Sequence, residues 1–253
     1  HKAIRRQRQM CIRDRYSILF VASVLASSSC MKVDNFDAPE AHVTGRIIDS
    51  TTGENILADQ GECRVRIWEK SFSLNPANQD IPVKQDGTYN NSKLFSGTYD
   101  VVPEGAWWPC DTIRVGIGKK TVTQNFEVTP YLKLIDFQVN LEGENLTMSC
   151  RLDAPITEGL PQIMEVRPYL SLNQFCGASN CINYYNTNDF RVNVMKSWDK
   201  IEKEGDGRTI PFEVTVPVKR GYIYFVRMGA KVKDSFEKHN LSLIHISEPT
   251  RLD

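Results

Sequence analysis

The sequence predicts an all-β protein built from two tandem β-sandwich domains. Two long runs of short segments alternate apolar and polar residues, the pattern of strands that bury one face. Turn-forming residues separate the segments at short intervals, with Asp86-Gly87 and Gly143 as clear examples. No stretch of comparable length shows the helical period, so we expect strands and loops throughout.

The first run of strands predicts a domain over residues 41–129. Thr129-Pro130 marks its end, because proline holds the preceding residue in an extended conformation and cannot donate to a strand ladder. Gly97 interrupts an alternating segment, which indicates either a positive φ or a close approach of another chain segment. The expected strand segments are 42–49, 63–70, 93–103, 111–120 and 121–128.

The second run of strands predicts a domain over residues 130–240. Residues 190–207 are ambiguous: the first half alternates and the second half is charged, so we expect a strand followed by a solvated loop. The other expected strand segments are 131–140, 146–152, 162–172, 212–218 and 222–232.

Both ends of the chain differ in composition from the rest. Residues 1–15 and 241–253 match, codon for codon over most of their length, the two strands of a transposase adapter used in sequencing libraries. We therefore interpret both segments as translated adapter. In β-sandwiches of this kind a final strand normally follows segment 222–232, and here the adapter replaces it. Because residues 241–246 alternate between apolar and polar side chains, we expect them to occupy that vacant sheet edge as a substitute last strand.

The charge balance argues against a nucleic-acid partner. The whole chain of 253 residues has a formal net charge of zero, and residues 16–240 hold 24 Lys and Arg against 28 Asp and Glu. Proteins that bind nucleic acids usually present a strongly basic face to the phosphates. We therefore expect no nucleic-acid partner.

Residues 16–30 have the form of a signal peptide with a lipobox. An apolar core ends in Ser28 and Ser29, small residues that suit a signal peptidase, directly before Cys30. We expect lipidation of Cys30, and residues 31–40 would then form a polar tether to the first domain. The segment is too short for a stable membrane span. The acyl chains would hold the protein to a membrane.

Five cysteines remain outside the adapter and the lipobox. Cys176 and Cys181 could close a loop as a disulfide, and Cys63 and Cys110 could link parts of the first domain. Reduced, buried thiols that act as small apolar side chains explain the same spacing equally well. No CxxC pair or paired histidine is present, so we expect no metal site.

Candidate chemistry is sparse. The sequence lacks the nucleophile elbow, the HExxH motif, the Walker loop and the dinucleotide fingerprint, and we expect neither an enzyme nor a cofactor.

Aromatic pairs are the only binding signal, since flat apolar rings can stack on sugars. The candidates are Trp107 and Trp108, which core or interface packing explains as well, and Tyr184 and Tyr185, which lie in an Asn-rich segment.

Several motifs resemble known families. Gly45, Ile47, Asp49 and Gly53 carry the pattern that opens the transthyretin-like, carboxypeptidase-regulatory β-sandwich, and residues 85–103 resemble its second motif. Segment 222–232 resembles a strand of immunoglobulin or fibronectin-III domains. With the lipobox, residues 34–54, the GAWWP motif and residues 126–134, the chain closely resembles a family of Bacteroidota lipoproteins that carry a domain of unknown function.

The resemblance implies an outer-membrane role in nutrient capture, because genes of that family often lie beside pairs similar to SusC and SusD. The expected location is therefore the outer membrane, lipid-anchored at the cell surface. We therefore expect a non-catalytic accessory lipoprotein of a SusC/SusD-like uptake system that binds polysaccharide. The alternative is a scaffolding lipoprotein that contacts the transporter and has no ligand of its own.

Overall fold

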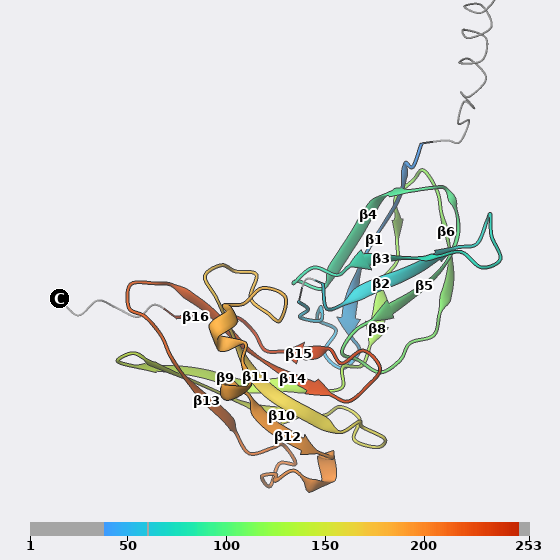
Figure 1. The fold of residues 1–253 in the computed structure, drawn as a ribbon. Coiled ribbons are helices and arrows are strands. Elements are labelled where there is room, and N and C mark those ends of the chain that lie inside the picture. Colours follow the sequence, from blue (N-terminus) through green and yellow to red (C-terminus); the bar gives the residue numbers. More distant parts are fainter. Residues whose placement is uncertain (1–37, 60, 248–253) are drawn as a thin grey trace, which may run out of the picture. The chain divides into compact units, whose positions relative to one another are not determined.

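The computed structural model describes residues 38–59 and 61–247, and these residues form two β-sandwich domains within one compact unit, Pro39–Asp253 (Figure 1). The described part contains strands and three short 3₁₀ turns, Asn183–Tyr185 (η2), Asn188–Phe190 (η3) and Trp198–Lys200 (η4). It holds no helix long and apolar enough to cross a membrane. The all-β fold predicted from the sequence is confirmed.

Our interpretations of residues 1–15 and 16–30 and of Cys30 lie outside the described residues, as do most of the tether and residues 248–253.

The N-terminal domain packs two sheets against each other. In one sheet β4 pairs with β1, and β7 and β8 pair with the other edge of β1; the second sheet has the order β3-β2-β5-β6. The strands are β1 (Ala41–Asp49), β2 (Arg64–Glu69), β3 (Asn78–Pro82), β4 (Thr88–Leu94), β5 (Gly97–Glu104), β6 (Ile113–Ile117), β7 (Val122–Thr123) and β8 (Phe126–Val128).

Two details of this domain differ from the sequence prediction. Strand β3 was not expected, because only Ile81 of its side chains is buried and the alternation is therefore missing. Segment 93–103 divides into β4 and β5 at Phe95-Ser96. Of the two explanations for Gly97, close approach is correct: a Cβ there would lie 2.6 Å from the Ser71 hydroxyl and 2.7 Å from a Glu69 carboxylate oxygen.

The C-terminal domain is a second two-sheet sandwich. One sheet has the order β13-β10-β9, and the other has the order β12-β11-β14-β15, with β16 also paired to β14. The strands are β9 (Lys133–Glu142), β10 (Asn145–Asp153), β11 (Ile163–Ser171), β12 (Val192–Lys196), β13 (Phe212–Pro217), β14 (Tyr224–Val232), β15 (His239–Leu241) and β16 (His245–Ser247).

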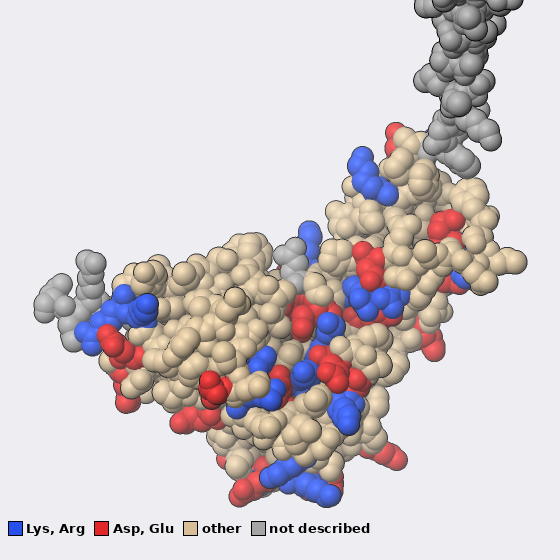
Figure 2. Space-filling model, viewed as in Figure 1, with Lys and Arg blue, Asp and Glu red and all other residues tan. Residues whose placement is uncertain are grey.

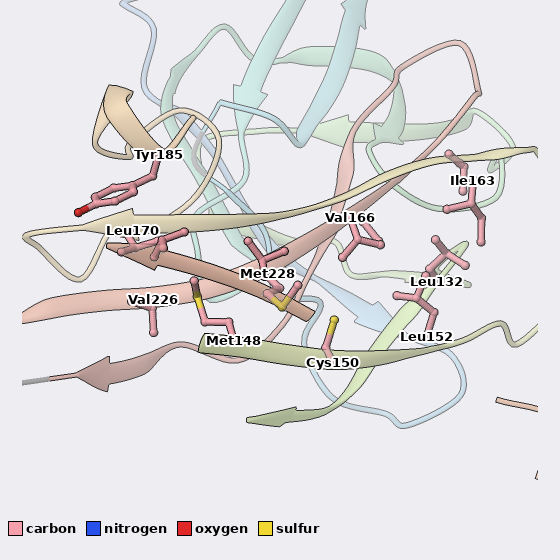
Figure 3. Packing of buried hydrophobic residues seen from close by; sticks show 14 of the residues in the cluster. Leu132, Met148, Cys150, Leu152, Ile163, Val166, Leu170, Tyr185, Val226 and Met228 are labelled. Carbon is pink, nitrogen blue, oxygen red and sulfur yellow. The ribbon is translucent and has the colours of Figure 1, made fainter. Parts of the chain in front are cut away.

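The core of the C-terminal domain lies between its two sheets. Figure 3 shows Met148 and Cys150 of β10 pointing toward Val166 and Leu170 of β11, and all four are buried. Alternation along each strand places every second side chain in this layer. Tyr185 lies at the edge of the same cluster, beyond Leu170, so the core reaches the loop that carries η2.

The charged half of segment 190–207 is less solvated than its composition predicts. The predicted strand is present as β12. The expected solvated loop is partly wrong, because the chain turns at η4 and buries Trp198 and Ile201 in the core. Lys203 lies over the Trp198 ring, 5.2 Å from its centroid, so a charged residue covers an aromatic one.

Residues 241–246 occupy the sheet edge as expected. Strand β15 pairs Leu241 with Gly229, and β16 pairs His245 and Ile246 with Val226 and Phe225 of β14. The strand breaks between Leu241 and His245. An alternating segment can therefore pair with β14 because the pairing uses backbone groups common to all residues.

A buried carboxylate in the C-terminal domain is surrounded by cationic groups. Arg191 donates to Glu165 at 2.8 Å, and the His239 ring lies 3.2 Å from the other carboxylate oxygen. The hydrogen bond with His239, together with Arg167 and Lys231 nearby, lowers the pKa of Glu165 from 4.5 to about 2 against the opposing effect of burial. Glu165 is thus ionised down to strongly acidic pH.

This lowered pKa predicts an acid-sensitive stability. A carboxylate with a depressed folded-state pKa stabilises the fold above its unfolded pKa, and that contribution disappears as the pH falls through the folded value. We expect the Glu165-dependent part of the unfolding free energy to decline between about pH 4.5 and pH 2. Urea unfolding of the wild type and Glu165→Gln should show a difference that shrinks over this range. Glu213→Gln, at an exposed position, is the control, and a constant difference for Glu165→Gln would contradict the assignment.

Candidate ligand-binding groove

An open groove lined by four tyrosines lies in the C-terminal domain and has a volume of about 640 Å³. Its apolar lining and its size suit a small organic ligand or part of a longer one. The residues that line it are Glu144, Leu172, Ile182, Tyr184, Tyr185, Pro217, Val218, Lys219, Tyr222 and Tyr224.

Two local structures bring the four rings together. The η2 turn supplies Tyr184 and Tyr185, and the start of β14 supplies Tyr224, with Tyr222 two residues before it. Residues two apart in an extended chain point to the same face, so Tyr222 and Tyr224 point to the same side. The ring centroids of Tyr222 and Tyr224 are 6.3 Å apart, and those of Tyr184 and Tyr185 are 5.1 Å apart with the edge of one ring facing the other.

The inner pair of rings forms a fixed floor. Tyr185 and Tyr224 are 6% and 4% exposed. The Tyr185 hydroxyl donates to the Pro217 carbonyl at 2.7 Å, and the Lys219 backbone N–H donates to the Tyr224 hydroxyl at 3.2 Å. Burial raises the pKa of Tyr185 to about 12, and the neighbouring Tyr224 adds to the shift, so the phenol is neutral at physiological pH.

The outer pair of rings faces solvent. Tyr184 is 59% exposed and Tyr222 is 50% exposed, and Leu172 beside them is 54% exposed. Large apolar side chains at this exposure are available for contact with a ligand. The groove therefore combines a rigid floor with two accessible aromatic walls.

Charged groups lie at the margin of the groove. The Glu144 carboxylate is 3.5 Å from Nε of Arg220 and most of its side chain is exposed. The Glu144 backbone carbonyl accepts from the Val218 N–H at 2.7 Å, which fixes the loop that carries Lys219. These groups can donate to and accept from the hydroxyls of a ligand whose apolar face lies on the rings.

The structure separates the aromatic residues selected from the sequence. Tyr184 and Tyr185 both line the groove, although Tyr185 is part of its floor rather than exposed. The hypothesis that Trp107 binds a ligand is wrong in this structure: its side chain is 2% exposed in the N-terminal core and donates to the Pro103 carbonyl at 3.3 Å. Trp108 is half-buried and packs against the C-terminal core, with its ring centroid 5.2 Å from that of Tyr131. Neither tryptophan lines the groove.

The possible disulfide between Cys176 and Cys181 is not formed. Cys176 and Cys181 are both free thiols, as are Cys63 and Cys110. The Cys176 thiol is buried, lies 3.3 Å from the Tyr169 carbonyl as a donor, and has its pKa raised to about 12 chiefly by burial. The alternative explanation from the sequence, buried thiols acting as small apolar side chains, describes Cys63 and Cys176, whereas Cys110 and Cys181 are partly buried. Among the described residues no group of His, Cys, Asp and Glu could hold a metal ion.

Half of the tyrosines in the groove were not selected from the sequence. Tyr222 and Tyr224 were interpreted only as alternating strand residues. Tyr222 lies two residues before β14 begins, where the chain enters the sheet. This position distinguishes the pair from ordinary strand residues. Their proximity to Tyr184 depends on the pairing of β11 with β14, which composition does not reveal.

A second, more polar pocket of about 330 Å³ is lined by Asp59, Gln85, Phe175, Ser179 and Asn180. Its carboxylate is already engaged: Asp59 accepts from the Ser179 backbone N–H at 2.6 Å and from the Ser179 hydroxyl at 2.8 Å. Only the Phe175 ring in this pocket is available for stacking. The tyrosine-lined groove is therefore the stronger candidate.

Comparison with solved structures shows the same fold in other proteins. A DUF3823 family protein from Bacteroides uniformis ATCC 8492 is 19% identical with a TM-score of 0.69, and the match covers 83% of this chain and 99% of that one. A protein from the same organism described as a "putative carbohydrate binding protein" is 20% identical with a TM-score of 0.65 and the same coverage. A DUF3823 family protein from Parabacteroides merdae ATCC 43184 is 20% identical with a TM-score of 0.60, covering 84% of this chain and all of that one.

Family models match most of the chain. The N-terminal domain of DUF3823, a protein family of unknown function, matches residues 41–129, and the DUF3823 C-terminal domain, also of unknown function, matches residues 132–245. No curated protein shows significant similarity to the chain. With both of its β-sandwich domains matched, this chain belongs to the DUF3823 family.

Proposed function

We propose that this protein binds carbohydrate and that the tyrosine-lined groove is its site. The observation that carries the proposal is the pair of half-exposed rings, Tyr184 and Tyr222, held above a floor of two hydrogen-bonded tyrosines. Aromatic faces cover the apolar C–H faces of sugar rings, and rigid rings lose little conformational entropy on binding. The similar fold of a Bacteroides uniformis protein described as carbohydrate binding agrees with this function.

The groove suits binding rather than hydrolysis. Glycoside hydrolysis usually needs two carboxyl groups on either side of the scissile bond. Glu144 is the one carboxylate among the residues that line the groove, and it faces Arg220 at the margin. A non-catalytic accessory protein is therefore the function we propose.

The lipobox supports a lipid anchor, and the resemblance to Bacteroidota lipoproteins supports an outer-membrane location. Acylation of Cys30 would anchor the protein in the outer membrane at the cell surface, where a polysaccharide-binding groove would collect substrate for a SusC/SusD-like uptake system. Mass spectrometry of the N-terminal peptide from membrane fractions tests the anchor: a diacylated Cys30 supports it, and an unmodified N-terminus contradicts it.

A glycan array tests binding. The unit Pro39–Asp253 contains both cores and can be applied to plant, microbial and host polysaccharides. We expect saturable binding to a subset of glycans that weakens in Tyr222→Ala and persists in Phe175→Ala, which changes an exposed aromatic residue of the other pocket. If folded protein binds no glycan, the scaffolding role replaces this proposal.

A further inference from the structure

Four separate segments of the N-terminal domain meet at one end of its sandwich. Ala41, the first residue of β1, pairs with Leu94 at the end of β4, immediately before Phe95. Across the turn, the backbone N–H of Thr98 donates to the Ser71 hydroxyl at 2.8 Å, which places loop 70–77 beside residues 95–97. Loop 118–121 joins them, because Gly97 pairs with Ile117 and the Thr121 hydroxyl lies 3.2 Å from the His42 ring.

This end of the domain exposes large apolar side chains. Leu74 is 92% exposed and Phe72 is 71% exposed, the highest fractions among the large apolar residues of the described chain, and Phe95 is 46% exposed. Residues 71–77 carry no charge, and the tip of the hairpin formed by β2 and β3 shows only uncharged surface in Figure 2. Burying a side chain of this size in an apolar phase is favourable, so such a tip is typical of an interaction surface.

Lysines lie on the same segments as the apolar residues. Lys93, Lys119 and Lys120 are exposed, and Lys70 donates to the Leu74 carbonyl at 3.3 Å and lies 3.9 Å from Asp100. The carboxylates on the same segments are Glu40 and Glu69, and Glu69 accepts from the Ser71 backbone N–H. Basic side chains together with exposed apolar ones match the interface of an anionic lipid layer.

The chain itself places this end near the membrane. Residues 31–40 separate Cys30 from Ala41, and a fully extended chain spans at most about 3.6 Å per residue, so the start of β1 lies within about 40 Å of an acylated Cys30. The end of the domain where β1 starts is the end that exposes Leu74 and Phe72. The point of attachment and the apolar surface therefore lie at the same end of the domain.

We propose that this surface, the membrane tip (Lys70, Phe72, Leu74, Lys93, Phe95, Lys119 and Lys120), rests on an anionic lipid surface and fixes the orientation of the anchored protein. The inference rests on the lipid anchor of the proposed function. It is independent of the carbohydrate site. A tip that inserts two apolar side chains adds a defined contact to the lipid anchor, because the anchor holds the tip at high local concentration near the bilayer.

Vesicle co-sedimentation of the unit Pro39–Asp253 tests the tip without any acyl chain. Vesicles of phosphatidylethanolamine and phosphatidylglycerol at 3:1 provide the anionic surface, and phosphatidylcholine vesicles the neutral one. We expect Phe72→Ser with Leu74→Ser to lower partitioning into anionic vesicles at least tenfold, and Lys119→Gln with Lys120→Gln to lower it about tenfold. Ile156→Ser with Ile210→Ser, which changes two exposed apolar residues of the C-terminal domain, should leave it unchanged.

Two results would overturn the proposal. One is an equal partitioning of the wild type into anionic and neutral vesicles or into neither, and the other is unchanged partitioning of the Phe72 and Leu74 variant. Because the tested unit lacks Cys30, these results are separate from the acylation test. The glycan array reports on the groove alone, so failure of the carbohydrate site leaves the vesicle result intact.

Discussion

Replacing Gly45 with alanine is expected to destabilise the protein by at least about 3 kcal/mol, a large fraction of the about 5–15 kcal/mol that stabilises a typical domain. A Cβ at this position would lie 1.7 Å from the Gln124 carbonyl oxygen and 2.8 Å from the Tyr89 hydroxyl. The Gln124 carbonyl accepts a hydrogen bond from the Tyr89 hydroxyl, and the Gln124 backbone N–H donates to the Thr44 carbonyl at 2.8 Å. The clash thus involves a residue whose backbone is fixed by two hydrogen bonds. Removing the clash would require β1 to move away from residue 124.

Urea unfolding followed by tryptophan fluorescence measures this loss. Gly116→Ala is the matched control, because Gly116 is also in a strand but has no neighbour within 4 Å of a new Cβ. We expect the control to stay within about 1 kcal/mol of the wild type. If Gly45→Ala were as stable as Gly116→Ala, the close approach between β1 and residue 124 would be wrong.

The same glycine shows what the sequence could predict about the fold. The motif that contains Gly45 and Asp49 identified the opening strand of the first domain, and the structure explains it in physical terms. Gly45 allows the close approach of residue 124, and Asp49 accepts from the N–H and the hydroxyl of Thr51 at 2.8 and 2.6 Å to close the following turn. Strands with one clearly buried face, such as β1 and β10, were predictable because their alternation is complete.

Other elements could not be predicted because their determinants are not local. Strand β3 buries only Ile81 and forms through backbone pairing with β2 at the sheet edge. Trp198 lies in a charged segment, and its burial depends on a core formed by distant strands. Alternation along one segment carries no information about such partners.

Only two of the four tyrosines of the candidate site could be selected from the sequence, because the position of the other two depends on contacts between distant segments. Tyr184 and Tyr185 stood out as an aromatic pair in a polar segment, and both line the groove. Tyr222 and Tyr224 were recognisable as strand residues, but their position beside η2 follows from the pairing of β11 with β14. Trp107 and Trp108, the other aromatic candidates, do not line the groove: the first is buried in the N-terminal core and the second packs against the C-terminal core. Composition alone does not distinguish such burial from exposure.

Removing both outer rings, Tyr184→Ala with Tyr222→Ala, is expected to weaken glycan binding by about 2–3 kcal/mol, or about 30- to 150-fold in Kd. Each ring offers an exposed face to the ligand and also contacts one ring of the floor. The unfolding free energy should therefore fall by about 1–3 kcal/mol, because each lost aromatic contact contributes about 0.5–1.5 kcal/mol, and the variant should remain folded. Leu172→Ala, at an exposed apolar wall residue, should weaken binding less, because it removes no aromatic face.

The most direct measurement of the central claim is a calorimetric titration of one glycan identified on the array into the wild type, the double variant and Phe175→Ala. We predict saturable binding for the wild type and Phe175→Ala with similar Kd, and a Kd at least about 30-fold higher for the folded double variant. Equal affinity of the folded double variant and the wild type would contradict the assignment of the tyrosine-lined groove as the carbohydrate site.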